Sequence, residues 1–350
     1  MGQLDVTHLT KSWADSTAVD GINFSVNSGE FVALLGPSGC GKSTTLRMIA
    51  GLETPSDGRV FLNGSDITQT SPGQRGLTMV FQSYALFPHL SVKDNILFGL
   101  QVRKVSPEER KRRLSFAVEL VDLGPHLDKK PSQLSGGQCQ RVALARSIVS
   151  EAPLCLMDEP LSNLDAKLRG QMRTELRALQ QKLGMTVLYV THDQTEAMSM
   201  ADRIILMNAG RIEQTGRPEE LYNAPASTFV AGFVGSPPMN LIGQDEHILG
   251  IRPEHVSLAP AELSNSLQSA IVVSCDYLGA DTLVNASFND AKLQIRLSGH
   301  QPISAGTVLG ISWQQQHEHY FCKTRQQRIE RQNNSAVNNN HKAKESEYAA

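Results

Sequence analysis

The ten residues GPSGCGKSTT (36–45) constrain the fold more than any other stretch of this chain. They contain three glycines and four hydroxyl side chains, so they have almost nothing to bury. The apolar run FVALL (31–35) precedes them, and the helix-like run LRMIAG (46–51) follows. This order predicts a buried strand at 31–35, a tight loop, and a helix over 43–51 that ends at Gly51. A strand, a glycine-rich loop and a helix in succession are typical of α/β folds.

The same loop matches the pattern G-x-x-x-x-G-K-[ST]. Its glycines allow backbone N–H groups to approach phosphate oxygens, and the following helix adds its positive N-terminal end. Lys42 could then reach the β- and γ-phosphates, and the Ser43 hydroxyl could bind Mg²⁺. The apolar strand before the loop favours this interpretation over a turn that binds nothing. We therefore predict a nucleoside triphosphate site in the phosphate loop (residues 36–44), which comprises Gly36, Pro37, Ser38, Gly39, Cys40, Gly41, Lys42, Ser43 and Thr44.

Two acids end a second apolar run, LCLMDE (154–159). Asp158 would lie at the carboxyl end of a strand, where α/β sheets bind their ligands, and it could hold Mg²⁺ there. Glu159 would follow it as a general base that polarises the attacking water. An acid pair alone could also begin a helix, so its meaning depends on the phosphate loop. Together the two elements favour hydrolysis over transfer of a phosphoryl group by a kinase.

A second glycine-rich helix start occurs at LSGGQ, the signature segment (residues 134–138). It opens the apolar run RVALARSIV (141–149) and also suits an anion. A single site does not need two phosphate-binding loops. The segment therefore binds a second ligand, or serves a nucleotide held by another molecule, or is a plain helix cap.

The composition is that of a globular protein long enough for about two domains. The 350 residues are 40% hydrophobic and 19% charged, and the formal net charge of −2 gives no reason to expect nucleic acid as the main partner. The five cysteines are scattered without metal-ligand spacing, as in a reduced cytosolic protein. No secretory signal is visible, and no apolar run approaches the ~20 residues that span a bilayer. Work at a membrane would therefore need a partner.

Three further apolar segments, at 154–158, 186–191 and 203–207, alternate with helical patterns. They predict a mostly parallel sheet that is covered on both faces. Ser106 begins another helix, with proline and two acids in its first turn. We predict an α/β domain over residues 1–235, a β-rich domain over 236–330, and a disordered Asn-rich tail over 331–350.

Taken together, the motifs resemble those of the ABC transporter ATPases, because LSGGQ lies between the phosphate loop and the acid pair. The resemblance covers about residues 2–330. It implies that Trp13 stacks on adenine, that Gln82 in VFQSYALFPHLSV binds Mg²⁺ and acts in catalysis, and that His192 in YVTHDQTEAM is the catalytic switch histidine. It also implies that SNLDA (162–166) is the D-loop, with Asp165 near the nucleotide.

The family resemblance also gives the second glycine-rich segment a role. Two ATPase subunits of this family pack head-to-tail, so that each signature segment faces the partner's phosphate loop. The expected contacts to ATP bound by a second copy come from Ser135, Gly136, Gly137 and Gln138. A P-loop ATPase fold follows, with a mostly parallel sheet, an antiparallel β part and a helical signature subdomain.

The C-terminal part resembles the carbohydrate-importer ATPases of the maltose type, through GSPPMNLI (235–242) and IRPEH (251–255). That subfamily carries an OB-like regulatory domain. Later segments look most like the ATPase of the sn-glycerol-3-phosphate importer, while import of maltose or another sugar remains an alternative. A soluble ABC ATPase not tied to transport is a further alternative, but this chain has one phosphate loop and no long coiled coil.

The resemblance implies an ATPase with ATP and Mg²⁺ on the cytoplasmic face of the bacterial inner membrane, as a peripheral subunit. Its partners would be a second copy, two transmembrane permease subunits and, through them, a periplasmic or extracellular solute-binding protein. Two departures are visible. Cys139 follows LSGGQ where a larger residue is usual, and only LIGQDEHILG separates GSPPMN from IRPEH, which predicts a shortened regulatory domain.

Overall fold

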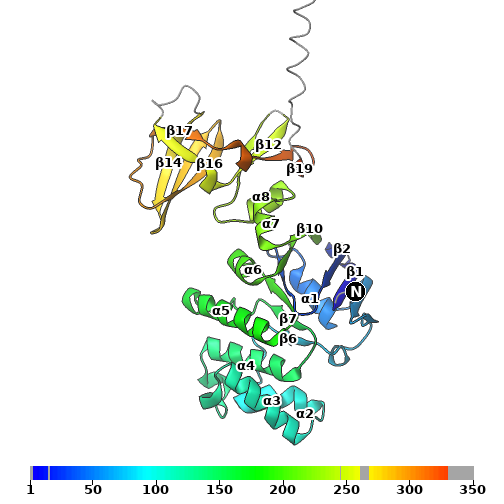
Figure 1. Cartoon of the computed structure of the whole chain (residues 1–350). Coiled ribbons are helices and arrows are strands. Elements are labelled where there is room, and N and C mark those ends of the chain that lie inside the picture. Colours follow the sequence, from blue (N-terminus) through cyan, green and yellow to red (C-terminus); the bar gives the residue numbers. More distant parts are fainter. Residues whose placement is uncertain (1–2, 15, 245, 261–267, 330–350) are drawn as a thin grey trace, which may run out of the picture. The chain divides into compact units, whose positions relative to one another are not determined.

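The computed structural model describes residues 3–14, 16–244, 246–260 and 268–329 (Figure 1). The chain divides into two compact units, residues 1–224 and 225–350. The boundary at residue 235 predicted from the sequence falls inside the second unit. The predicted disordered tail at 331–350 lies outside the described residues.

The first unit contains a six-stranded sheet at its centre. In spatial order its strands are β10 (Arg211–Gly216), β9 (Arg203–Asn208), β3 (Phe31–Leu35), β8 (Val187–Thr191), β7 (Cys155–Asp158) and β6 (Thr78–Val80). Neighbours from β9 to β6 pair in parallel, and β10 adds an antiparallel edge. The three apolar segments predicted as strands are β7, β8 and β9. Parallel strands end at the same edge, so the residues that follow β3, β6, β7 and β8 meet there.

A second, antiparallel sheet completes the β structure of this unit. Its strands, in spatial order, are β2 (Ser16–Val26), β1 (Leu4–Trp13), β4 (Asp57–Leu62) and β5 (Ser65–Asp66). Helix α1 (Lys42–Ala50) contacts both β2 and the parallel strands β7 and β8. The helix that begins after the phosphate loop is therefore held between the two sheets.

Two hydrophobic cores cover the two faces of the parallel sheet. Successive residues of β8 alternate between them, because Val187 and Tyr189 belong to one core and Leu188 and Val190 to the other. All four side chains are fully buried. This alternation is what the side-chain period of two produces in a strand that is covered on both faces, and it confirms the predicted sheet type.

The remaining helices of the first unit have local capping signals. They are α2 (Val92–Val102), α3 (Pro107–Leu120), α4 (Gly136–Ser150), α5 (Ala166–Leu183), α6 (Gln194–Met200) and α7 (Pro218–Asn223). The predicted cap Ser106 accepts a hydrogen bond from the Glu109 N–H at the start of α3. Helices α2, α3 and α4 contact one another and form a helical subdomain (Figure 1).

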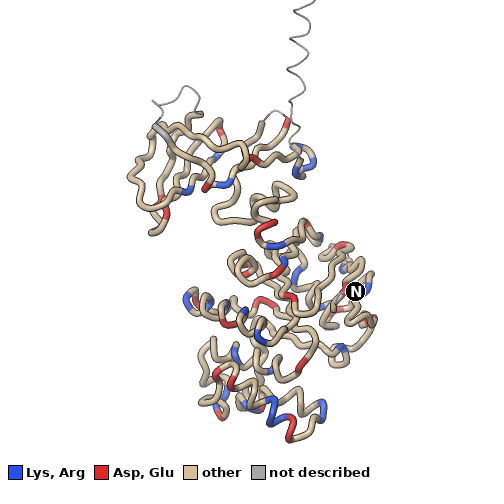
Figure 2. The backbone as a smooth tube through the Cα atoms, viewed as in Figure 1, with Lys and Arg blue, Asp and Glu red and all other residues tan. Residues whose placement is uncertain are grey.

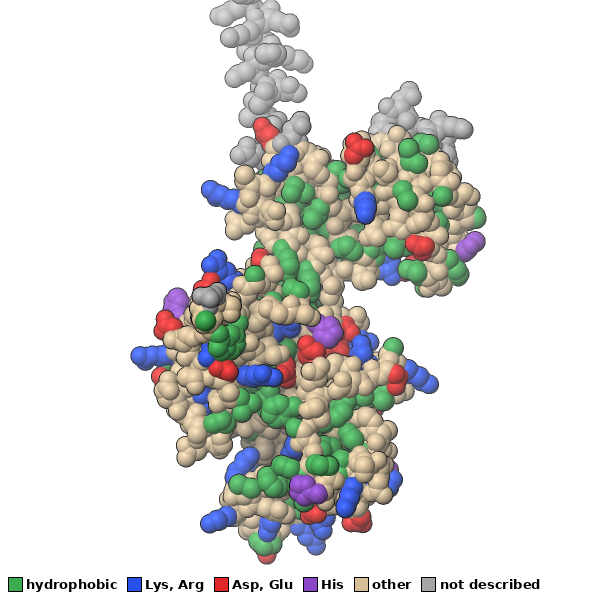
Figure 3. Space-filling model, turned by 180° about the vertical axis from the view of Figure 1, so that it is seen from behind, with side chains coloured by type: hydrophobic (Ala, Val, Ile, Leu, Met, Phe, Trp, Pro, Cys, Tyr) green, Lys and Arg blue, Asp and Glu red, His purple; other side chains and the backbone are tan. Residues whose placement is uncertain are grey.

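Charged side chains of both signs are mixed over the first unit. Figure 2 shows basic and acidic residues together along α3, where Arg112 and Arg113 form ion pairs with Glu109 and Glu151. The face drawn in Figure 3 likewise intersperses lysine and arginine with acids. On this face, positive and negative side chains are therefore mixed rather than gathered into separate patches.

The second unit begins with a short helix, α8 (Thr228–Phe233), followed by two antiparallel sheets. One sheet contains β11 (Asn240–Gly243), β12 (His247–Ile251), β18 (His319–Cys322) and β19 (Arg328–Ile329). The other contains β13 (Ser257–Pro260), β17 (Val308–Ser312), β14 (Gln268–Tyr277), β15 (Asp281–Phe288) and β16 (Ala291–Ser298). The all-β pattern predicted for this region is confirmed. Arg252 of the IRPEH motif is buried and donates to the carbonyls of Ala231 and Val234, so it ties that motif to the chain before GSPPMN.

Candidate functional site

The phosphate loop runs from the end of β3 to the start of α1, and two of its glycines are needed for steric reasons. Gly41 has a φ of 101°, and a Cβ there would lie 2.3 Å from the Ala18 carbonyl oxygen. A Cβ on Gly36 would lie equally close, at 2.3 Å, to the Met207 carbonyl oxygen. A side chain at either position would clash with the backbone of another strand or loop. The loop is thus seated against β2 and the end of β9.

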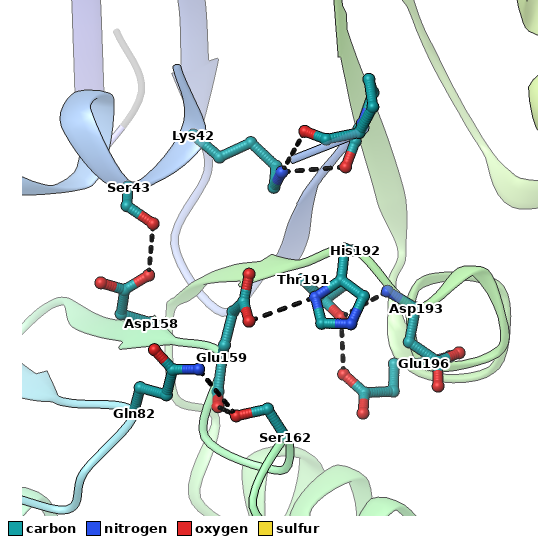
Figure 4. Close-up of polar contacts among 12 residues, drawn as sticks. Lys42, Ser43, Gln82, Asp158, Glu159, Ser162, Thr191, His192, Asp193 and Glu196 are labelled. Carbon is teal, nitrogen blue, oxygen red and sulfur yellow. Dashed lines mark hydrogen bonds and ion pairs between the residues drawn. The ribbon is translucent and has the colours of Figure 1, made fainter. Parts of the chain in front are cut away.

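Lys42 is directed back onto its own loop. Its ammonium group donates to the carbonyl oxygens of Gly36 and Pro37, each at 2.8 Å (Figure 4). The side chain is only 5% exposed, so these carbonyls replace water around the charge. Burial raises the pKa of the neighbouring Cys40 thiol, which the nearby Lys42 charge only partly offsets. The thiol therefore stays neutral beside the lysine.

Ser43 and Asp158 bring two oxygens together at the edge of the sheet. The Ser43 hydroxyl donates to Asp158 Oδ1 at 2.9 Å (Figure 4). Asp158 ends β7 and is 8% exposed, and this burial raises the pKa of its carboxyl group against the effect of the Ser43 hydrogen bond. A buried carboxylate and a hydroxyl are hard oxygen ligands, which Mg²⁺ prefers. These two side chains could therefore hold a divalent cation.

Glu159 and His192 form a pair beside this oxygen site. His192 Nδ1 lies 3.1 Å from Glu159 Oε2 (Figure 4). Glu159 has a φ of 45°, a left-handed conformation that a non-glycine residue rarely adopts, and its N–H donates to the Val190 carbonyl. The backbone thus turns sharply at Glu159, and the side chain meets the histidine that follows β8. Such strain is found most often at functional sites.

Gln82 connects the end of β6 to the D-loop. Its amide Nε2 donates to the Ser162 hydroxyl at 3.2 Å, and Asn163 Nδ2 donates to the Gln82 carbonyl at 2.8 Å. Gln82 itself is exposed. Residues at the carboxyl ends of four different parallel strands, β3, β6, β7 and β8, therefore meet along one edge of the sheet.

Comparison with known proteins agrees with this geometry. A family model described as "ABC transporter" matches residues 19–162, and one described as "TOBE domain" matches residues 249–321. The chain is 43% identical over 367 aligned residues to the sn-glycerol-3-phosphate import ATP-binding protein UgpC of Cupriavidus necator, covering 94% of this chain and 100% of the relative. A relative of the same name from Rhizobium johnstonii is 46% identical over 320 residues, covering 87% of this chain and 93% of its own. This chain belongs to the ABC transporter ATPases.

Solved structures of ABC ATPases resemble somewhat more than half of this chain. The ATP-binding cassette MJ0796, a dimer bound to ADP and Pi, matches with a TM-score of 0.55 and 31% identity, over 61% of this chain and 98% of that one. The cbiO1 protein of Clostridium perfringens, part of the cbiONQ transporter complex, matches with a TM-score of 0.58 and 30% identity, over 63% and 90%. The predicted fold class is confirmed. No helix in the described part of the chain is both long and apolar enough to cross a membrane.

The ABC signature segment forms the start of α4. The Ser135 hydroxyl accepts from the Gln138 N–H, and the Gln138 side chain accepts from the Ser135 N–H, which together make a capping box. Gly136 and Gly137 form the first turn, and Gln138 also lies 3.2 Å from the His126 ring. These contacts stay close to the start of α4, so within one chain the segment acts as a helix cap. The departure at Cys139 fits here, because its thiol packs on the hydrophobic core beside Pro131.

Trp13 lies at the end of β1 and is 45% exposed, so its ring is open to a ligand. Lys11 lies 5.2 Å from the centre of the indole ring and pairs with Glu53 at 2.6 Å. The exposed ring and its cationic neighbour fit a stacking role, and the ion pair with Glu53 holds the lysine in place. Asp165, by contrast, caps α5 by accepting from the Leu168 N–H.

The site also contains residues that the motifs did not reveal. Glu196 of α6 is 3% exposed and accepts from the hydroxyls of Tyr189 and Thr191, each at 2.7 Å. Thr191 in turn accepts from the Asp193 N–H at 2.9 Å, so the chain on both sides of His192 is fixed (Figure 4). Burial raises the pKa of Glu196, although both hydroxyls oppose this. No sequence pattern indicated that Glu196 is buried, because the helix around it, QTEAMSM, mixes polar and apolar residues.

Proposed function

We propose that this chain is the ATP-hydrolysing, energy-coupling subunit of an ABC importer for sn-glycerol-3-phosphate. The observation that carries the proposal is the convergence of Lys42, the Ser43–Asp158 pair and the Glu159–His192 pair at one edge of the sheet. The names of the relatives support the coupling to import and the choice of solute. The alternative solute is maltose or another sugar, because GSPPMNLI and IRPEH resemble segments of the maltose-type importers.

Binding of ATP would use groups that already face one another. Backbone N–H groups of the phosphate loop and the Lys42 ammonium would bind the phosphates, while Trp13 would stack on adenine. The Ser43 hydroxyl, the Asp158 carboxylate and the Gln82 side chain amide would hold Mg²⁺. When bound, Mg²⁺ would neutralise charge on the β- and γ-phosphates. To bind ATP, Lys42 must leave the carbonyls of Gly36 and Pro37.

Hydrolysis would use the Glu159–His192 pair. The Glu159 carboxylate would accept a proton from a water molecule whose oxygen attacks the γ-phosphorus, while the bond to the bridging oxygen breaks and leaves ADP and phosphate. With its hydrogen on Nδ1, His192 would donate to Glu159 Oε2 and hold that carboxylate in position. The Thr191–Asp193–Glu196 contacts would fix the backbone that carries the histidine.

The proposed assembly contains two copies of this chain. Each signature segment would contact the γ-phosphate of the partner's ATP, through the Ser135 hydroxyl and the first turn of α4, with Asp165 nearby. The dimeric cassette with ADP and Pi supports this arrangement. Each copy would also bind one of two transmembrane permease subunits at the cytoplasmic face of the inner membrane. The permease in turn would receive the solute from a periplasmic or extracellular binding protein, and no nucleic acid takes part.

A groove in the first unit supports the permease contact. It has a volume of about 410 Å³ and is lined by Phe81, Phe87, Phe98, Leu100 and Arg103 among others. Phe87 and Phe98 pack with ring centres 4.4 Å apart, and Phe98 is 38% exposed. Tyr84, which the sequence placed in the same apolar loop, is instead buried in the core. An apolar groove beside Gln82 could receive a short helix of a membrane partner.

The experiment that tests the proposal compares Glu159→Gln with Glu119→Gln, an exposed carboxylate of α3. Loss of the base should lower Mg²⁺-ATP hydrolysis by about 100-fold or more while ATP binding persists, and the control should match the wild type. If Glu159→Gln hydrolysed ATP at the normal rate, Glu159 would not be the general base. In vesicles containing the assembled transporter, stimulation of ATP hydrolysis by sn-glycerol-3-phosphate but not maltose would support the solute. The reverse result would overturn it.

A further inference from the structure

Two consecutive residues of the glutamine loop (residues 81–90) have an unfavourable backbone conformation. Tyr84 has a φ of 62° and Ala85 has a φ of 45°, so both lie in the left-handed region without being glycine. A single such residue is uncommon, and two in succession persist only where surrounding contacts hold them. They follow Gln82 by two and three residues. The position of Gln82 therefore depends on whatever holds this turn.

Arg146 of α4 holds it. One guanidinium nitrogen donates to the Ala85 carbonyl and the other to the Tyr84 carbonyl, each at 2.8 Å. The planar fork of an arginine fits two successive carbonyls, which a lysine can contact only one at a time. Burial lowers the pKa of Arg146, as expected for a guanidinium withdrawn from water. The Arg146 side chain therefore holds both carbonyls of the Tyr84–Ala85 turn.

The helix that carries Arg146 is the one that begins at the signature segment. Gly136 and Arg146 belong to α4, and ten residues of helix separate them by about 15 Å. Cys139 of the same helix contributes to the core in which Tyr84 is buried. A rigid helix would therefore transmit a displacement at its start to the Tyr84–Ala85 turn.

On its other side the glutamine loop is attached to the D-loop. Gln82 donates to Ser162, and Asn163 donates to the Gln82 carbonyl. Ser162 also donates to the Glu159 carbonyl at 2.9 Å. A continuous series of contacts therefore leads from α4 through the glutamine loop to Ser162 and Asn163 of the D-loop, and from Ser162 to Glu159.

We propose that Arg146 is a positioning residue that couples the signature helix to Gln82. Contact of the signature segment with the partner's ATP would move α4, and Arg146 would move the Tyr84–Ala85 turn with it. Gln82 would then reach its working position only when the other ATP is in place. This makes hydrolysis at one site depend on occupancy of the other. The inference rests on the proposed ATPase function and deepens it.

The test uses the purified full-length chain and compares Arg146→Lys with Arg113→Lys. Arg113 is a half-buried guanidinium of the same helical subdomain that also donates to a main-chain carbonyl of α4, that of Val149. Arg146→Lys should lower kcat by about tenfold, which corresponds to about 1.4 kcal/mol, and bring the Hill coefficient for ATP toward 1. Its KM for ATP and its melting temperature should stay close to those of Arg113→Lys.

Substitutions at the exposed Ala85 test the same turn without touching Arg146. Ala85→Val should reproduce the loss of kcat and of cooperativity, because a β-branched residue disfavours a positive φ. Glycine adopts a positive φ freely, so adding Ala85→Gly to Arg146→Lys should restore part of both. Ala85→Val, made with Arg146 unchanged, keeps the test decisive if Arg146→Lys does not fold.

Several outcomes would overturn the inference. These are equal kinetics of Arg146→Lys and Arg113→Lys, a fall in kcat with the Hill coefficient unchanged, or normal kinetics of Ala85→Val. The proposed ATPase function would fail in a different way. In that case the wild-type chain would bind Mg²⁺-ATP but would not hydrolyse it. An active wild type with insensitive Arg146 and Ala85 variants contradicts only the coupling.

Discussion

Two glycine-rich helix starts in the first unit differ in how their backbone N–H groups are used. At α1, the cap is Gly41 in a left-handed conformation, and no side chain accepts from the first turn. At α4, the Ser135 hydroxyl and the Gln138 amide already close a capping box. Uncapped N–H groups need an external acceptor, whereas a capped helix is complete by itself. The first helix start therefore leaves N–H groups without a side-chain acceptor, whereas the second is complete without a ligand.

The largest effect should come from removing the Lys42 ammonium group at the first helix start, which should weaken ATP binding. Lys42→Ala should weaken ATP binding by about 2–4 kcal/mol, or roughly 30- to 1,000-fold, because charge-assisted hydrogen bonds to the phosphates are lost. Equilibrium titration with a fluorescent ATP analogue would measure this. Lys93→Ala, at an exposed position of α2, is the control and should bind as the wild type does. Unchanged affinity of Lys42→Ala would break the assignment of the phosphate loop to the chain's own nucleotide.

A smaller and different effect should follow from the second helix start. Ser135→Ala should leave ATP binding by the single chain unchanged and lower hydrolysis by about 10- to 100-fold, since one hydroxyl donor to the partner's γ-phosphate is lost. It should also cost about 1 kcal/mol of stability through the lost cap. The matched control is Ser106→Ala, which removes the equivalent cap of α3. Equal hydrolysis by the two variants would mean that Ser135 is only a cap.

The smallest effect concerns a third helix start at the same sheet edge, which is closed by an acid. At α6, Asp193 accepts from the Thr195 and Glu196 N–H groups, and Glu196 lies buried in the first turn. Burial raises the pKa of Glu196, so this group's contribution to stability is present below its unfolded pKa and is lost as the pH rises through the folded value. Glu196→Gln should therefore gain stability relative to the wild type as the pH rises through the folded pKa of Glu196.

Thermal unfolding of both proteins at each pH would measure the difference in melting temperature. Glu119→Gln provides the comparison for an exposed acid and should show no such trend. If the difference between Glu196→Gln and the wild type stayed constant or fell with rising pH, the burial of an ionisable group at this helix start would not be destabilising. The start of α6 would then differ from the two glycine-rich helix starts in its hydrogen bonds but not in the electrostatic cost of a buried acid.

Contiguous motifs made most of the site predictable from the sequence. The phosphate loop, Asp158 and Glu159 each follow an apolar strand, and parallel pairing brings the ends of such strands together. Strand limits were less certain. The run GLTMVF (76–81) has the composition of a six-residue strand, but β6 covers only Thr78–Val80, because its neighbour β7 begins at Cys155 and pairs with it over three residues.

Contacts between distant residues could not be predicted in this way. Arg146 and Tyr84 are separated by 62 positions, and Asn163 and Gln82 by 81, so no local pattern links them. Glu196 is closer in sequence to its partners Thr191 and Tyr189, but no helix or strand period pairs residues five or seven positions apart across a turn. Local rules describe which residues begin or end an element, but the partners of a polar side chain are set by the packing of the whole unit.

The direction of Lys42 has a consequence for the speed of a repeated cycle. Its ammonium group is satisfied by two carbonyls of its own loop, so the departure of a nucleotide does not leave a buried charge without partners. Binding then exchanges one set of hydrogen bonds for another, and only the difference between the sets contributes to affinity. In the proposed cycle, this exchange would lower the free-energy cost of releasing product from Lys42 and so favour turnover over tight retention.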